Sequence, residues 1–321
     1  MLMSSALFVT TVPITLEAFL LPYADHFRAQ GWRVDAAANG ATAASAIPEH
    51  FDHRYDVAWS RNPLAPHNLL GTARRIRALC AANGYDLVHV HTPVAAFVTR
   101  WALRGLRKTS GGPVVIYTAH GFHFYRGQSP LPGALLWSLE RLAAPWTDYL
   151  VTVNREDFEA AKKLGGIVPE RVRLIPGIGV DTARFSPDAT RPKSVADIRR
   201  ELEIAEDAFV LGMVAELAPV KRHALALEAL ARVSIPSVVL VLVGAGPLES
   251  RLRVKAAAFG VSERMRWAGY RRDIPEVLAA SDAFLLCSKR EGLNRSVLEA
   301  MAFGIPVIGT DTRGITDAVG P

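Results

Sequence analysis

Short apolar runs alternate with longer amphipathic segments along nearly the whole chain, and this alternation limits the possible folds more than any other feature. It is typical of α/β proteins, in which helices connect the strands of a parallel sheet. In the first half, the expected strands are residues 6–9, 34–37, 87–90, 114–117, 149–153 and 173–175. The expected helices there are residues 15–30, 69–83, 93–107, 131–144 and 156–164.

A segment rich in proline and glycine, residues 175–187, separates this series from a second one and marks a domain boundary. The second series has expected strands at 210–214, 238–243, 265–268, 283–286 and 307–308, and helices at 222–232, 247–259, 274–280 and 296–302. We therefore predict two doubly wound domains, residues 1–186 and 187–321, with a ligand cleft between them. The chain stops soon after its last expected strand, before any closing helix, so we expect the second domain to be incomplete at its C-terminus.

Composition excludes several classes of protein. Hydrophobic residues make up 50% and charged residues 21% of the 321, as in ordinary soluble domains. No apolar stretch is long enough to span a bilayer. Residues 1–21 lack a basic start and contain Glu17, which favours a buried strand and helix over a signal peptide. Cys80 and Cys287 lie far apart without CxxC spacing, which suits a reducing cytosol and indicates no metal site.

The net charge of +6 and the pI near 9.5 favour anionic partners. Residues 100–108 interleave basic and apolar side chains, which suits either a membrane-surface helix or a half-buried helix end with a solvated basic face. No nucleic-acid-binding motif is visible, and we expect no nucleic-acid partner.

Glu291 and Glu299 flank the most informative segment. A strand, a glycine-containing turn, a helix and another strand follow one another there, and the turn and helix start can bind phosphate. Ionised carboxylates accept hydrogen bonds from hydroxyl groups, so sugar or ribose is the expected neighbour. The alternative is structural: Ser296 to Glu299 fits a helix capping box, and Glu291 could be a solvated loop charge.

Two further turns follow strands of the second series. Lys221, with Arg222 beside it, is placed to neutralise a diphosphate, although solvated charge is the commoner role of a lysine. Gly244 and Gly246 allow either close approach of a ligand to the backbone or simply a tight turn, with Pro247 in the first turn of the next helix.

Four histidines follow strands of the first series. His89 and His91 should share one strand face, and His120 and His123 lie in the loop after the next strand. We interpret them as hydrogen-bonding groups for a substrate, with a structural role open for each one. A metal site is a poor interpretation, because Asp86 is the only nearby acid and the spacing is not HExxH. The hydrolase pattern Gly-x-Ser-x-Gly and the P-loop are both absent.

In order and spacing, these motifs resemble the retaining glycosyltransferases of family 4, which have the GT-B fold. The resemblance rests on Val88-His-Val-His-Thr-Pro93, Thr118-Ala-His-Gly121, residues 175–185, residues 243–248, and the Glu291 to Glu299 pair in the family's Glu-x7-Glu spacing. Residues 117–127 look like the branch that builds bacterial surface polysaccharides on a lipid carrier.

The resemblance implies a donor, expected to be a UDP-sugar, on the second domain, a lipid-linked or glycan acceptor on the first, and transfer with retention. The donor residues are then Lys221, Arg222, Gly244, Gly246, Glu291, Gly292, Leu293, Asn294 and Glu299. Glu299 would bind the ribose, Glu291 the sugar and Lys221 the diphosphate, with Lys221, Glu291 and His120 catalytic. His91 and His123 would lie on the acceptor side. Neither a metal nor another cofactor is expected.

Two departures from the family pattern stand out. Glu216 occupies a position where many members carry an arginine, so more of the phosphate charge falls to Lys221 and Arg222. The family also usually continues with a helix that packs back on the first domain. A sugar-nucleotide 2-epimerase and an inactive nucleotide-sugar-binding protein remain alternatives. The expected location is the cytoplasm, with peripheral contact at the inner face of an anionic plasma membrane.

Overall fold

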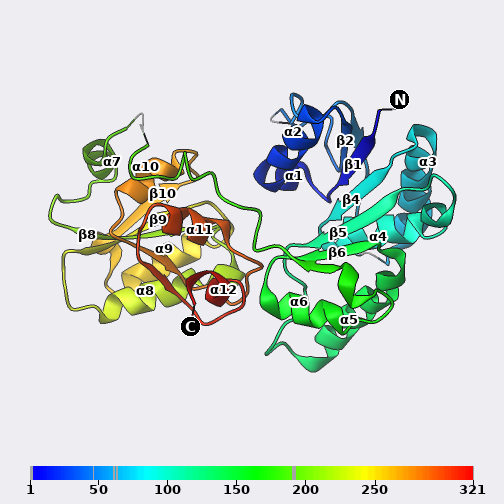
Figure 1. Cartoon of the computed structure of the whole chain (residues 1–321). Coiled ribbons are helices and arrows are strands. Elements are labelled where there is room, and N and C mark those ends of the chain that lie inside the picture. The colour runs from blue at the N-terminus through cyan, green and yellow to red at the C-terminus, as the bar shows by residue number, and fades with distance from the viewer. Residues whose placement is uncertain (1–2, 46, 61, 63, 190–192, 321) are drawn as a thin grey trace. The chain divides into compact units, whose positions relative to one another are not determined.

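The computed structural model describes residues 3–45, 47–60, 62, 64–189 and 193–320. These residues form two compact units, the first ending at Pro176 and the second beginning at Gly177 (Figure 1). Each unit is built around one sheet, and all the strand pairings among the described residues are parallel. The predicted α/β architecture with two parallel sheets is confirmed.

The first unit contains a seven-stranded sheet in the order β3-β2-β1-β4-β5-β6-β7. Its strands are β1 (Ser5–Val9), β2 (Arg33–Ala38), β3 (Arg54–Asp56), β4 (Leu87–His91), β5 (Val114–Ala119), β6 (Tyr149–Thr152) and β7 (Val172–Leu174). Its α-helices are α1 (Pro13–Phe19), α2 (Leu21–Ala29), α3 (Ala73–Asn83), α4 (Pro93–Leu103), α5 (Pro130–Ala143) and α6 (Arg155–Lys162). The strand order reverses between β1 and β4, and ligands of such sheets bind where the carboxyl ends of two such strands meet.

The second unit contains a five-stranded sheet in the order β10-β9-β8-β11-β12. Its strands are β8 (Phe209–Val214), β9 (Val238–Val243), β10 (Met265–Gly269), β11 (Ala283–Leu286) and β12 (Val307–Gly309). Its α-helices are α7 (Val195–Glu201), α8 (His223–Arg232), α9 (Glu249–Ala258), α10 (Ile274–Ala279), α11 (Arg295–Ala302) and α12 (Ile315–Val319). Here the strand order reverses between β8 and β11, so the loops after these two strands meet at the switch point.

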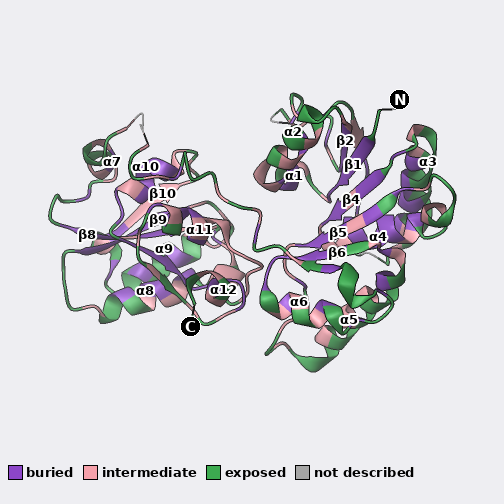
Figure 2. Cartoon of the chain, viewed as in Figure 1, coloured by how far each residue is buried: buried purple, intermediate pink, exposed green. Residues whose placement is uncertain are grey.

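Both sheets are covered on both faces, which explains the nearly continuous apolar runs of their strands. Along β1, Leu7 and Val9 join one apolar cluster, while Ala6 and Phe8 join another. Every residue of β9 is buried. Figure 2 shows the same pattern, with buried strands and helices that expose their outer faces.

Three predicted helices have different limits in the structure. The helix predicted at 15–30 is two helices, α1 and α2, which meet at Leu20. Pro22 lies in the first turn of α2, and proline lacks the N–H that a continuous helix would require there. The helix predicted at 69–83 begins as a π-helical segment, Asn68–Thr72, before α3. The helix predicted at 247–259 begins at Glu249, so Pro247 precedes the helix and is not in its first turn.

Three short elements were not predicted: β3, α7 and α12. The α12 helix follows β12, so the expectation that the chain ends before any further helix was wrong. The helix predicted at 93–107 ends at Leu103, and a 3₁₀ turn, Leu106–Lys108, follows Gly105.

The boundary between the two units lies ten residues before the predicted boundary at 186 and 187, because residues 177–186 belong to the second unit. Phe185 is 2% exposed in the core of that unit. The Arg184 guanidinium donates to the Arg272 carbonyl at 3.1 Å. Gly177 lies so close to Leu293 that an added Cβ would be 2.6 Å from its Cδ2 atom. The proline and glycine residues therefore marked the connecting segment, but they did not indicate which unit that segment packs on.

Candidate functional site

Two loops of the second unit bring Lys221 and Glu291 together at its switch point. Lys221 follows β8 and Glu291 follows β11. Lys221 Nζ lies 2.7 Å from Glu291 Oε1, and the two side chains keep 18% and 9% of their exposure. A further bond joins the loops, because the Lys289 N–H donates to the Val220 carbonyl at 2.8 Å. The two predicted site residues are thus neighbours, although 70 positions separate them.

The start of α11 is built by Asn294 and not by Ser296. The Asn294 side chain accepts from the Val297 N–H at 3.2 Å, as an N-cap residue does. The Ser296 hydroxyl lies 2.6 Å from Asn294 Oδ1 and 2.9 Å from the Val214 carbonyl at the end of β8, and its single proton can be donated to either oxygen. The structural alternative of a capping box from Ser296 to Glu299 is therefore wrong, since the helix begins earlier and Glu299 lies beyond its first turn.

Glu299 is nonetheless a partnered side chain. It is 7% exposed, and its Oε1 atom lies 2.8 Å from Arg295 Nε. Burial raises the pKa of the Glu299 carboxyl, while the charges of Arg295 and Arg184 act in the opposite direction. A carboxylate has about four acceptor positions, so one arginine contact leaves capacity for a hydroxyl-bearing ligand. Sequence reasoning missed both arginines, because only α11 and the packing of residues 177–186 bring them near Glu299.

The predicted donor glycines at 244 and 246 lie against the backbone of the neighbouring loop. An added Cβ at Gly244 would be 2.1 Å from the Ala215 carbonyl oxygen, and one at Gly246 would be 2.7 Å from that of Leu217. Both positions therefore require glycine for loop-to-loop packing, whether or not a ligand approaches. This packing shapes the loop that leads to Lys221.

The predicted donor loop at Glu291 and Gly292 contacts two residues that sequence reasoning missed. An added Cβ at Gly314, where φ is +78°, would be 2.0 Å from the Gly292 carbonyl oxygen. Arg313, which is 7% exposed, donates from Nε to the Glu291 carbonyl at 3.2 Å. The loop is therefore supported by the segment between β12 and α12, which gave no sequence signal for this role.

The remaining donor-side charges lie at the surface of the same loops. Arg222 is exposed and adopts a left-handed conformation, with φ 53°. Burial raises the pKa of the Cys287 thiol, and the charge of Arg222 opposes that shift, so the guanidinium lies near the end of β11. Glu216 is also exposed.

Three histidines of the first unit form one cluster at its switch point. The rings of His89 and His91 lie 4.1 Å apart on β4, which confirms that they share a strand face. His91 Nδ1 lies 3.0 Å from His120 Nε2, and the His120 ring stacks on Phe19 at 5.5 Å. His89 Nε2 lies 2.8 Å from the Thr118 hydroxyl.

Burial makes this cluster neutral at physiological pH. It lowers the pKa of His89 to about 3 and that of His120 to about 4, and it lowers the pKa of His91 well below its ordinary value. A neutral imidazole offers one donor and one acceptor nitrogen, which suits hydrogen bonding to hydroxyl groups.

Thr92, directly after β4, is a strained position beside this cluster. Its φ is +62° and its ψ is 139°, which is rare for a residue with a branched side chain. Its hydroxyl oxygen accepts from the Thr11 N–H at 3.0 Å and lies 2.7 Å from the Thr11 hydroxyl. These bonds join the loops after β1 and β4, and strain of this kind is concentrated at functional sites.

His123 is exposed and lines a small cavity of about 40 Å³ with Tyr117, Phe124 and Glu140. Within the described ranges, no group of three or more histidine, cysteine, aspartate or glutamate side chains could hold a metal ion.

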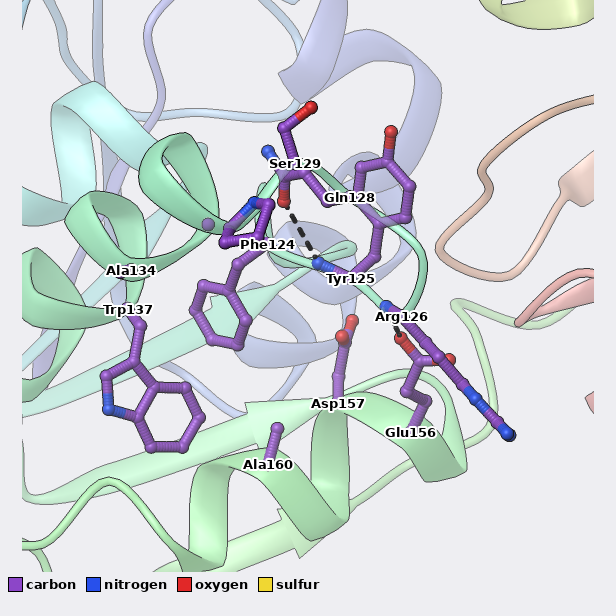
Figure 3. A pocket seen from close by; sticks show the side chains of 12 residues that line it. Phe124, Tyr125, Arg126, Gln128, Ser129, Ala134, Trp137, Glu156, Asp157 and Ala160 are labelled. Atoms are coloured by element: carbon purple, nitrogen blue, oxygen red, sulfur yellow. Dashed lines mark hydrogen bonds between the residues drawn. The ribbon is translucent and has the colours of Figure 1, made fainter.

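A larger pocket of about 380 Å³ lies between the loop after β5, α5 and α6 (Figure 3). Its wall includes Phe124 and Trp137, whose rings meet edge to face at 5.2 Å. Its polar rim includes Arg126, whose backbone N–H donates to the Glu156 carboxylate at 3.0 Å. The Asp157 carboxylate, which is buried, accepts from the Phe122 N–H at 3.0 Å. Sequence reasoning did not find this pocket.

The basic segment at 100–108 is largely structural. Arg100 is 1% exposed and pairs with Glu140 at 2.8 Å. Arg107 pairs with Asp148 at 2.5 Å. Of the two interpretations, the half-buried helix end fits these two ion pairs, and contact of this segment with a membrane surface stays a prediction. None of the described helices has the length and apolar character needed to cross a bilayer.

Family models match both units of the chain. Residues 16–184 match the family described as Glycosyltransferase Family 4, and residues 194–321 match Glycosyl transferases group 1. The chain belongs to this family of glycosyltransferases, which confirms the resemblance seen in the sequence.

Similar proteins agree with this assignment. EpsD of Bacillus subtilis strain 168, a putative glycosyltransferase, is 37% identical over 313 residues, which are 96% of this chain and 79% of EpsD. The UDP-Gal:alpha-D-GlcNAc-diphosphoundecaprenol alpha-1,3-galactosyltransferase of Escherichia coli is 32% identical over 236 residues, which are 72% of this chain and 59% of that protein. The chain thus spans only part of each relative.

Among solved structures, HepE of Anabaena in complex with UDP and glucose matches with a TM-score of 0.78 at 22% identity, covering 99% of this chain and 83% of HepE. WaaG, a glycosyltransferase involved in lipopolysaccharide biosynthesis, matches with a TM-score of 0.71 at 18% identity, covering 97% of this chain and 82% of WaaG. The predicted GT-B fold is thereby confirmed.

Proposed function

We propose that this protein transfers a hexosyl group from a UDP-sugar to a hydroxyl of a lipid-linked glycan, with retention at the anomeric carbon. The observation that carries the proposal is the Lys221–Glu291 pair, which lies directly before the start of α11 at the switch point. The choice of UDP and of a lipid-linked acceptor draws on the printed descriptions of HepE and of the Escherichia coli galactosyltransferase.

Lys221 supplies the cation for the diphosphate. Without donor its charge is balanced by Glu291. A nucleoside diphosphate carries more negative charge than one carboxylate, so it competes for Lys221 and releases Glu291 to accept from a sugar hydroxyl. The N-terminus of α11 adds a favourable dipole for the same anion. Arg222 is the second cation of the site, and the exposed Glu216 lowers its net positive charge.

Glu299 is placed for the ribose. Its carboxylate is partly neutralised by Arg295, which reduces repulsion from the nearby diphosphate. Its remaining acceptor positions suit the two ribose hydroxyls.

The reaction then depends on stabilising the departing diphosphate. The bond from the anomeric carbon to the diphosphate oxygen breaks, and the new bond forms to the acceptor hydroxyl oxygen on the same face, whose proton leaves with the diphosphate. Lys221 and the α11 start act on the charge that develops, and removing one such group costs on the order of a hundredfold in rate. His120, which is neutral, contacts the reacting sugar by a hydrogen bond.

The first unit supplies the acceptor site. The pocket lined by Phe124 and Trp137 offers aromatic surface for a sugar or a lipid chain (Figure 3). Beside it, α5 exposes Leu131, Leu135 and Leu142 by 85%, 60% and 53%. These leucines recur at helical spacing on one face of α5, which suits contact with the lipid part of the acceptor or with the membrane that holds it.

The test is turnover of UDP-sugars with a lipid-linked acceptor, without added metal and with EDTA. We expect UDP release that depends on the acceptor, and at least a hundredfold loss in Lys221→Met. Glycosyl transfer that is equally fast in the variant would contradict the role of Lys221. Incubation with donor alone separates the alternatives, since epimer formation without acceptor indicates a 2-epimerase, and tight UDP binding without any turnover indicates a binding protein.

A further inference from the structure

In the histidine cluster of the first unit, the surroundings of one His91 nitrogen affect where the proton of His120 lies. His91 is 1% exposed, and its Nδ1 atom shares a hydrogen bond of 3.0 Å with His120 Nε2. Its other nitrogen, Nε2, is buried and has no hydrogen-bond partner in the described part of the chain. The ring proton of His91 can therefore form a hydrogen bond when it lies on Nδ1 but not when it lies on Nε2.

The two rings are neutral, so only one proton lies between them. Burial keeps the pKa of both histidines below the physiological range, and the neighbouring imidazoles lower the pKa of His91 further. In the first arrangement His91 Nδ1 carries the proton and donates to His120 Nε2, and His120 then carries its own proton on Nδ1. In the second, His120 Nε2 donates to His91 Nδ1, and the proton of His91 must lie on Nε2.

The second arrangement leaves a buried N–H group without an acceptor. Such orphaned donors are rarer in proteins than under-satisfied acceptors. The first arrangement leaves only a bare nitrogen at the same position, so it is favoured. The rings cannot easily turn to exchange these roles, because His91 stacks on Phe8 at 6.2 Å and His120 stacks on Phe19 at 5.5 Å.

We propose that His91 is a positioning residue that holds His120 in the tautomer with its proton on Nδ1. His120 then offers an N–H donor to the substrate and not a basic nitrogen. The consequence for the reaction rests on the proposed function: His120 donates a hydrogen bond to an oxygen of the donor sugar or of the departing diphosphate, and it does not remove the proton of the acceptor hydroxyl.

The direct test is two-bond ¹H–¹⁵N correlation NMR on the full chain labelled with ¹⁵N-histidine, at pH 7.5 and without nucleotide. His120→Gln identifies the resonances of this ring. We expect a protonated Nδ1 and a bare Nε2. A protonated Nε2 in the unaltered protein overturns the proposal. Because this measurement needs no donor or acceptor, it stands apart from any failure of the proposed function.

A pair of variants tests the link between the rings. In His91→Phe we expect His120 to lose its single tautomer and kcat to fall at least tenfold, with little change in the KM for donor. In His91→Asn the side-chain amide can still donate towards His120, so most of the tautomer preference and of kcat should return. If His91→Phe leaves the His120 tautomer unchanged, His91 has no positioning role. Where His91→Phe does not fold, the spectrum of the unaltered protein decides.

Discussion

Replacing Glu291 with glutamine should make the protein bind UDP more tightly and turn over its donor more slowly. The side chain of Glu291 occupies Lys221 in the absence of ligand, at 2.7 Å. Glutamine keeps the size of the side chain but removes its charge. UDP then meets an unopposed lysine and no longer has to displace a carboxylate or lie beside one.

The size of the effect follows from the partial burial of the pair. Two unit charges about 4 Å apart interact by about 4 kcal/mol at the effective dielectric near a protein surface. The side chains of Lys221 and Glu291 keep 18% and 9% of their exposure, so solvent screening removes much of this energy. We expect a net gain of about 1–2 kcal/mol, which is ~5–30-fold in the dissociation constant of UDP.

Isothermal titration calorimetry with UDP at fixed ionic strength measures this change. Glu249→Gln is the matched control, because Glu249 pairs with Arg253 at 2.8 Å on the exposed surface of α9 and should leave UDP binding unchanged. Lys221→Met should weaken binding. UDP binding that is unchanged or weaker in Glu291→Gln would refute the exchange of partners at Lys221.

Three further predictions concern other parts of the site. Gly314→Ala should destabilise the fold by about 1–3 kcal/mol in thermal unfolding, because its Cβ would meet the Gly292 carbonyl, whereas Gly304→Ala has a similar positive φ but open space and should cost less. Ala134→Trp should fill the pocket beside α5 and raise the KM for acceptor about tenfold without changing the affinity for UDP. A KM that stays constant in this variant would disprove an acceptor role for the pocket. Burial lowers the pKa of His120 to about 4, below its unfolded value near 6.5. As the pH falls from 6.5 towards 4, the unfolded chain binds a proton at His120 that the folded protein does not, so the free energy of unfolding falls by up to about 1.4 kcal/mol per pH unit. In urea titrations, His120→Gln should flatten that slope.

Patterns confined to one strand or one turn predicted much of this fold. Both sheets, and the loops that carry Lys221 and Glu291, follow from apolar runs and glycine-containing turns. The break at Leu20 was also visible in principle, because Pro22 lies inside the predicted helix. The prediction of one helix at 15–30 followed the amphipathic pattern and gave no weight to the N–H that proline lacks, and it was wrong for that reason.

The parts that could not be predicted depend on contacts between distant segments. Arg184 acts on Glu299 because the connection between the units packs on the second one. Arg313 and Gly314 contact the loop at 291–292 from the segment between β12 and α12, which has no pattern of its own in the sequence. The capping residue of α11 is Asn294 and not Ser296, whose hydroxyl contacts both the Asn294 side chain and the end of β8.

Hydrogen–deuterium exchange with and without UDP tests most directly whether the switch point of the second unit is the donor site. Slower exchange is expected in peptides covering residues 216–223 and 287–299, where Lys221, Glu291 and the start of α11 lie. Peptides of the small-cavity wall around His123 should not change. Protection that is absent from both segments at saturating UDP, or that falls elsewhere, would contradict the account.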